Sequence, residues 1–170
     1  MGESNKIRDR VLCYLEGKEV LDLGCGDEKI VPWAVGVDSA EEHAKCPAAV
    51  DIQARVDPDS KDLLTRIGNR QFDVVFSSHT LEHIRAPILE TLNYWLLFVK
   101  SGGRMILYLP EENIYRYDPD HPKLRNPAHK HFLTQETFEY YLDQLFNVEV
   151  ELLTSLPLML YSFLVVLKKR

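Results

Sequence analysis

Apolar runs alternate along the chain with segments in which apolar residues recur three and four positions apart, and this alternation predicts strands separated by helices. The runs typical of strands occupy residues 19–24, 34–38, 48–52, 72–78, 102–110, 147–153 and 161–169. The helical segments occupy residues 4–17, 59–68, 86–100 and 134–145. Because the central runs are almost continuously apolar, we expect a mainly parallel sheet with helices on both faces.

Local signals mark the ends of the helices and the direction of the last strand. Ser4 is the predicted cap of the first helix, and Gly68 closes the second. Pro87 lies in the first turn of the third helix and Lys100 near its end, while Thr134 caps the fourth. The last two strands are joined without a helix, which is too short a connection for a parallel crossover, so we predict an antiparallel last strand.

Length, composition and charge narrow the class of protein. The 170 residues, 45% apolar and 27% charged, suit one globular domain spanning residues 1–170. The net charge of −6 argues against a nucleic-acid partner, which needs a basic face.

The cysteines and the N-terminus predict a cytoplasmic protein, and the apolar tail does not predict a membrane span. Cys13, Cys25 and Cys46 form no paired motif, which favours a reducing compartment over disulfides or a zinc site. The N-terminus is polar and charged, unlike a secretory signal. The apolar stretch over residues 152–167 is interrupted by Pro157 and is shorter than the roughly 20 residues of a membrane span, so we read it as two strands of a buried sheet.

The first strand ends in a glycine turn, and the second ends in an acid. Gly24 and Gly26 allow backbone angles closed to other residues and let a ligand approach the main chain. Asp38 lies at the end of the second strand, where a carboxylate accepts hydrogen bonds from ribose hydroxyls. The dinucleotide fingerprint requires a third glycine where this chain has Lys29, which disfavours a nicotinamide oxidoreductase.

Five segments in a fixed order carry a family resemblance: "VLDLGCG", "VGVD", "FDVVFSSHTLEHI", "VKSGGRMILYLP" and "SFLVVLKK". Through them the chain resembles the class I S-adenosylmethionine-dependent methyltransferases, in particular the small type 11 group. The resemblance implies an α/β fold with a Rossmann-like, doubly wound, mostly parallel seven-stranded sheet, and S-adenosylmethionine as cofactor. The cofactor-binding residues that we predict are Asp22, Gly24, Cys25, Gly26, Asp38, Ser39, Asp57, Ser78 and His79.

The first crossover is shorter than in the resembling family. Only eight residues, "DEKIVPWA", separate Gly26 from Val35, and Pro32 restricts them further. At most one helical turn fits, where the family usually has a full helix. Residues 4–17 are one candidate to cover the gap, and the fourth strand and the long loop then supply the pocket walls.

The family resemblance implies an adenine-binding acid after the third strand. Asp51, Asp57 and Asp59 all qualify by position. We favour Asp57, because Pro58 fixes a turn beside it, while a solvated loop acid remains an open alternative.

Histidines supply the candidate catalytic groups. His79 leaves the carboxyl end of the fourth strand, where it can touch the cofactor or take a proton from the acceptor. His129 and His131 lie two residues apart in a predicted lid over residues 111–133 and face one side of an extended segment. They form a substrate clamp, a proton acceptor or half of a metal site.

Residues near His129 and His131 bear on which of these three roles we expect. Glu82 and His83 are the extra ligands that a metal site would need, but we expect them to orient the loop and predict no metal. The basic residues of the lid indicate an anionic substrate: His121, Lys123, Arg125 and Lys130.

The predicted function is an S-adenosylmethionine-dependent methyltransferase acting on a small molecule, which is anionic or a sugar intermediate. Methyl transfer requires alignment, exclusion of water and removal of a proton, and it needs no strong nucleophile. The alternative is a methyltransferase-like docking module, which the shortened crossover and the apolar segment "LPLMLY" favour. The methyl acceptor and the oligomeric state are left open by the sequence.

Overall fold

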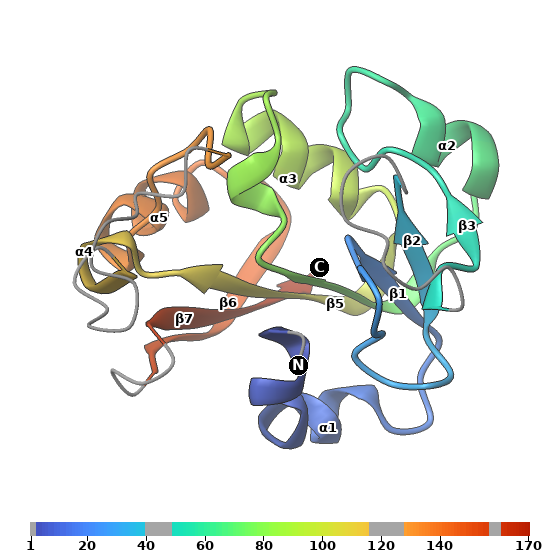
Figure 1. Cartoon of the computed structure of the whole chain (residues 1–170), viewed down its shortest axis with the longest axis horizontal. Coiled ribbons are helices and arrows are strands. Elements are labelled where there is room, and N and C mark those ends of the chain that lie inside the picture. The colour runs from blue at the N-terminus through green and yellow to red at the C-terminus, as the bar shows by residue number, and fades with distance from the viewer. Residues whose placement is uncertain (1–2, 40–48, 116–127, 157–160) are drawn as a thin grey trace.

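A seven-stranded sheet with the order β3-β2-β1-β4-β5-β7-β6 forms the centre of the computed structural model (Figure 1). The structure describes residues 3–39, 49–115, 128–156 and 161–170. The strands are β1 (Val20–Leu23), β2 (Val35–Asp38), β3 (Ile52–Gln53), β4 (Phe72–Ser78), β5 (Val99–Pro110), β6 (Val148–Ser155) and β7 (Ser162–Lys169). The helices are η1 (Glu3–Lys6), α1 (Arg8–Leu15), α2 (Asp62–Ile67), η3 (Leu81–His83), α3 (Ile88–Leu96), α4 (Glu112–Tyr115) and α5 (Gln135–Leu142).

Strand directions confirm the predicted α/β architecture. The strands β1 to β5 pair in parallel, whereas β7 is antiparallel to both of its neighbours, β5 and β6. The chain builds outward from β1 to β3 and then returns to place β4 on the other side of β1. This reversal makes the carboxyl ends of β1 and β4 the expected ligand-binding edge of the sheet.

Helices cover both faces of the sheet. On one face, α3 and α5 contribute Leu92, Trp95 and Phe138 to the larger apolar core. On the other face, α1 contributes Val11 and Leu15 to a second core, which also contains apolar residues of β4, β5 and β7. Figure 1 shows α1 on the opposite side of the sheet from α2, α3 and α5.

The crossover between β1 and β2 contains only turns, as its length predicted. The N-terminal helix takes the place of the missing crossover helix, because Ile30 and Val31 pack in one core with α1. Arg8 on α1 donates from Nε to the carbonyl oxygen of Ile30 at 2.6 Å and from Nη2 to that of Lys29 at 3.0 Å. The prediction that residues 4–17 cover the gap is therefore confirmed.

Several predicted boundaries were wrong for physical reasons. The third helix ends at Leu96, and Lys100 lies in β5, because Phe72 pairs with Val99 and draws this segment into the sheet. The N-cap of α1 is Ile7, with no capping hydrogen bond from a side chain, so Ser4 is not its cap.

Two predicted strands also differ from the observed ones. The third strand is limited to Ile52–Gln53: of its predicted range 48–52, residues 49–51 are described and lie outside the strand, and residue 48 lies outside the described residues. The strand β6 lies at the edge of the sheet and is largely exposed, whereas we expected both final strands to be buried. No helix among the described residues combines the length and apolar character needed to cross a membrane.

Candidate functional site

The glycine turn after β1 packs tightly against the segment that follows β4. Gly24 has a φ of +73°, and a Cβ atom there would lie 2.1 Å from the Thr80 hydroxyl oxygen. The amides of Gly24 and Cys25 donate to the Val37 carbonyl oxygen at 2.8 and 3.1 Å. The first glycine is therefore required by both backbone conformation and close approach.

Gly26, the second glycine of the turn, is hydrogen-bonded to Asp38, the acid at the end of β2. The Gly26 amide donates to Oδ2 of Asp38 at 2.8 Å. Gly26 has a φ of +57°, and no atom lies within 4 Å of the position of an added Cβ, so the turn opens onto free space there. The described residues give Oδ1 of Asp38 no hydrogen-bond partner, which leaves one carboxylate oxygen for a ligand.

Asp22 Oδ1 on β1 and Ser78 Oγ at the end of β4 are among the buried oxygen atoms that have no hydrogen-bond partner within the described residues. The Oδ2 atom of Asp22 accepts from the Ile30 amide at 2.6 Å. Burial raises the pKa of Asp22 to about 7, against the hydrogen bond from Ile30, which lowers it. Buried polar atoms usually have partners, so these two are suited to receive a ligand's polar groups.

The side chain of Cys25 takes no part in this opening. It is 5% exposed, and its Sγ atom lies 3.7 Å from the Ala49 carbonyl oxygen. Burial raises the pKa of the thiol to about 12, so the group stays protonated. A contact between Cys25 and a cofactor would therefore involve the main chain.

A cavity of about 510 Å³ lies beyond the ends of β2 and β3. Four separate segments line it, and they contribute Ser39 after β2, Asp57 after β3, His83 of η3 and Lys130 of the lid. Its volume is within the range of small-molecule sites in proteins. Two of the predicted cofactor residues, Ser39 and Asp57, thus share one cavity.

The acids after β3 have different surroundings. Asp51 accepts from the Gly36 amide at 2.7 Å and from Lys29 Nζ at 2.9 Å, so it ties the crossover to β2. Asp57 and Asp59 both line the cavity. Asp57 is 7% exposed and accepts from the Ser60 amide at 2.9 Å.

His79 lies in a constrained position after β4. Its φ of +49° is rare for a residue with a side chain, and the ring makes an edge contact with Tyr108 at 4.9 Å. The Nε2 atom lies 3.0 Å from the Ser162 hydroxyl oxygen. Burial, together with nearby positive groups, lowers the pKa of His79 to about 3, which makes the ring neutral at pH 7.

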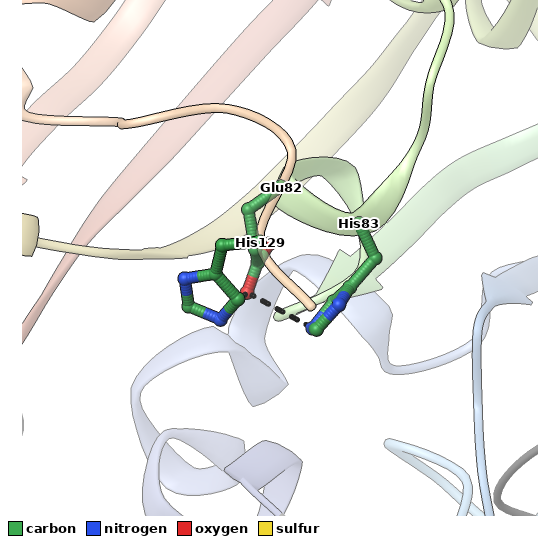
Figure 2. A group of neighbouring side chains, drawn as sticks. All are labelled: Glu82, His83 and His129. Carbon is green, nitrogen blue, oxygen red and sulfur yellow. Dashed lines mark ion pairs between the residues drawn. The ribbon is translucent and has the colours of Figure 1, made fainter. Parts of the chain in front are cut away.

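The two lid histidines take different partners. His129 is 9% exposed, and its Nδ1 atom is hydrogen-bonded to Oε1 of Glu112. Its Nε2 atom lies 3.9 Å from Oε1 of Glu82. Figure 2 shows Glu82, His83 and His129 gathered in one group, the first two from η3 and the third from the lid.

The neighbouring lid histidine contacts a different part of the chain. The Nε2 atom of His131 lies 3.0 Å from the Ala86 carbonyl oxygen. A shared action of His129 and His131 on an acceptor stays a prediction.

Glu112 is the site residue that the sequence interpretation missed. It begins α4, two residues after the end of β5 and at the same edge of the sheet as the other groups, and it is 1% exposed. The only available signal was its place after a buried strand. The predictions for His121, Lys123 and Arg125 fall at residues 116–127, outside the described residues.

The sequence of the chain matches a known protein family over most of its length. Residues 4–150 match the family described as "Methyltransferase domain". Comparison with curated proteins finds no match.

Solved structures give a likeness of fold. A SAM dependent methyltransferase from Archaeoglobus fulgidus superposes with a TM-score of 0.66 at 18% identity, covering 99% of this chain and 95% of that one. An S-adenosylmethionine dependent methyltransferase from Mesorhizobium loti gives a TM-score of 0.69 at 17% identity, covering 99% and 98%. The plantazolicin methyltransferase BpumL in complex with SAH gives 0.63 at 14% identity, covering 99% and 82%.

Proposed function

The chain belongs to the methyltransferase-domain family, and from this premise we propose that it is a cytoplasmic enzyme that methylates a small molecule with S-adenosylmethionine. One observation carries the proposal. The Gly26 amide is hydrogen-bonded to Asp38 at the carboxyl end of β2, an edge where ligands bind in this fold class, and the next residue, Ser39, lines the 510 Å³ cavity.

The residues at this edge fit the cofactor. Space is open beside Gly26, and Asp38 has an oxygen available to accept from ribose hydroxyls. Asp22 and Ser78 present buried oxygen atoms that the described residues leave without partners, and these suit the amino and carboxylate groups of the methionine part. Asp57 lines the cavity and is assigned to adenine.

The chemistry divides between cofactor and protein. When bound, S-adenosylmethionine supplies an electrophilic methyl group with a good leaving group. The protein holds the acceptor in line, excludes water and takes up a proton. We assign contact with the acceptor to His79, which its lowered pKa keeps neutral, and to the lid histidines His129 and His131; Glu112 fixes the orientation of His129.

The charges of the cavity favour an anionic acceptor or a sugar intermediate with a charged group. Arg55, Arg85 and Lys130 all line the cavity. Arg55 pairs with Asp57 at 2.9 Å, so Arg85 and Lys130 are the cations better placed to bind a phosphate or carboxylate.

Calorimetric titration with S-adenosylmethionine and S-adenosylhomocysteine tests the proposal. We expect binding by the wild type, a large loss in Asp38→Ala and a smaller loss in Asp38→Asn, which keeps one acceptor oxygen. Glu90→Ala removes the same charge from an exposed position of α3 and is expected to bind as the wild type does. No heat from the wild type at millimolar ligand would refute the proposal and favour the docking module.

A further inference from the structure

Three potential metal ligands meet where η3 contacts the lid. Ligand atoms of Glu82, His83 and His129 all lie within 4.8 Å of one another (Figure 2). The Oε1 atom of Glu82 is 4.0 Å from Nε2 of His83 and 3.9 Å from Nε2 of His129. We infer that these three side chains form a binding site for a divalent transition-metal ion.

Backbone contacts hold the two segments of this cluster together. The carbonyl oxygen of Glu82 accepts hydrogen bonds from the amides of Lys130 at 2.6 Å and His131 at 3.1 Å. Because these donors directly follow His129, they fix its main chain beside η3. Both of these contacts lie within the described residues.

Glu112 fixes the orientation of the His129 ring. Its side chain is 1% exposed and hydrogen-bonded to Nδ1 of His129, and when Glu112 is the acceptor of this bond the ring proton is on Nδ1. The lone pair of the ring is then on Nε2, the atom that faces Glu82. A carboxylate behind a histidine, with the opposite nitrogen directed at other ligands, is the usual outer-shell arrangement of protein metal sites.

The distances suit an ion of transition-metal size. Ligands about 2.1 Å from a tetrahedral ion lie roughly 3.4 Å apart, close to the separations of 3.9 and 4.0 Å in the cluster. The His83 side chain is 33% exposed, and its ring already contacts that of His129 at 4.8 Å between centroids. Two imidazoles and one carboxylate favour ions such as Zn²⁺, Co²⁺, Mn²⁺ or Fe²⁺ over Ca²⁺ and Mg²⁺.

The site is built at the wall of the cavity. His83 lines the 510 Å³ cavity, whereas Glu82 is fully buried behind it. Three protein ligands leave at least one coordination position for water or a ligand oxygen, as in sites that act on bound molecules. This revises the expectation, drawn from the sequence, that Glu82 and His83 only orient the loop.

Zn²⁺ titration of chelator-treated protein tests the inference without any cofactor. We expect one equivalent to bind with a dissociation constant of about 1 µM or tighter, as structured three-ligand sites do. Co²⁺ should give visible absorption bands of a nitrogen and oxygen site, without the strong thiolate band that binding at Cys13 would produce. Thermal melts with and without Zn²⁺ report the same binding through stabilisation.

Variants separate the site from adventitious uptake. His83→Ala and His129→Ala should abolish stoichiometric binding, and Glu112→Gln should weaken it about 10–100-fold. His131→Ala removes a histidine from the same segment, one bonded to the Ala86 carbonyl, and should bind as the wild type does. Because His83 is partly exposed, its variant is the least disruptive to folding, which circular dichroism checks.

Two results would overturn the inference. One is the absence of stoichiometric binding by the wild type at 100-fold above the expected dissociation constant, about 100 µM Zn²⁺. The other is folded His83→Ala and His129→Ala proteins that bind Zn²⁺ as the wild type does. Cofactor binding is measured separately, so failure of the metal site leaves the proposed function standing, and the converse also holds.

Discussion

Replacing Asp22 by Asn is expected to change how the stability of this protein depends on pH. Asp22 is 1% exposed at the end of β1, and burial raises its pKa from 3.8 to about 7. The folded protein therefore holds a proton on this side chain that the unfolded chain releases between about pH 4 and pH 7. The free energy of unfolding falls as pH rises through this window.

The size of the effect follows from the shift in pKa. A shift of about three pH units corresponds to roughly 4 kcal/mol of stability at 1.36 kcal/mol per unit. About 2.5 kcal/mol of this is lost between pH 5 and pH 8. In Asp22→Asn the side chain does not titrate, and its amide oxygen still accepts from the Ile30 amide. The buried amide nitrogen adds a cost of roughly 1–3 kcal/mol that does not vary with pH.

Urea denaturation at pH 5, 6, 7 and 8, followed by circular dichroism, measures the difference between variant and wild type. The stability of Asp22→Asn relative to the wild type should rise by about 2.5 kcal/mol across this range. All other titrating groups are the same in both proteins, so their contributions cancel in the difference between the two free energies of unfolding. Parallel curves for the two proteins would refute the reasoning, because they would show that Asp22 is ionised in the folded state.

Asp73→Asn is the matched control. A backbone amide hydrogen bond from Glu19 lowers the pKa of Asp73, so the stability that it contributes is lost only as pH falls below its ordinary range. Removing this charge should therefore give a difference from the wild type that stays flat between pH 5 and pH 8.

Three further predictions concern the glycine turn and the apolar core. Gly24→Ala should cost about 2–5 kcal/mol, because its Cβ atom meets the Thr80 side chain at 2.1 Å and its φ is positive. Gly26→Ala should cost only about 1–2 kcal/mol in urea denaturation, because its Cβ atom enters open space. The same Cβ atom should weaken the binding of S-adenosylhomocysteine. Equal losses of stability in Gly24→Ala and Gly26→Ala would contradict this reasoning. Trp95→Phe should cost about 2–3 kcal/mol, because the buried indole donates to the Val56 carbonyl oxygen at 2.8 Å, and a thermal melt unchanged from that of the wild type would exclude this role.

The elements that the sequence predicted best are those set by local pattern. The strand β4 has the predicted bounds, Phe72–Ser78, because its nearly continuous apolar run is typical of a strand covered on both faces. The capping of α5 by Thr134 was likewise a local signal and is confirmed by its hydrogen bond from the Thr137 amide. The end of α3 was not predictable, because an apolar helix passes directly into the apolar strand β5 with no polar break.

The candidate site was predictable only in part, for a related reason. Its turn and its acid, Gly26 and Asp38, follow strands whose ends the pattern marks. The contact between Glu82 and His129 joins segments far apart in the chain, and it depends on where the lid returns to η3. The pattern of apolar residues in the sequence cannot predict such a contact, and it cannot predict the contact between Glu112 and His129 either.

A cofactor pocket is possible without the usual helix, because other contacts hold the shortened crossover in place. Ile30 donates its amide to Asp22 on β1 and accepts Arg8 of α1 at its carbonyl oxygen, so one residue links the first strand to the N-terminal helix. The crossover is thus held at both main-chain groups, although it has no helical hydrogen bonds of its own. A helix N-terminus would add favourable polarity for the carboxylate of a cofactor. Without it, we expect cofactor binding under the proposed function to depend more heavily on the side chains at the ends of the strands, above all on Asp38, which also holds the turn through Gly26.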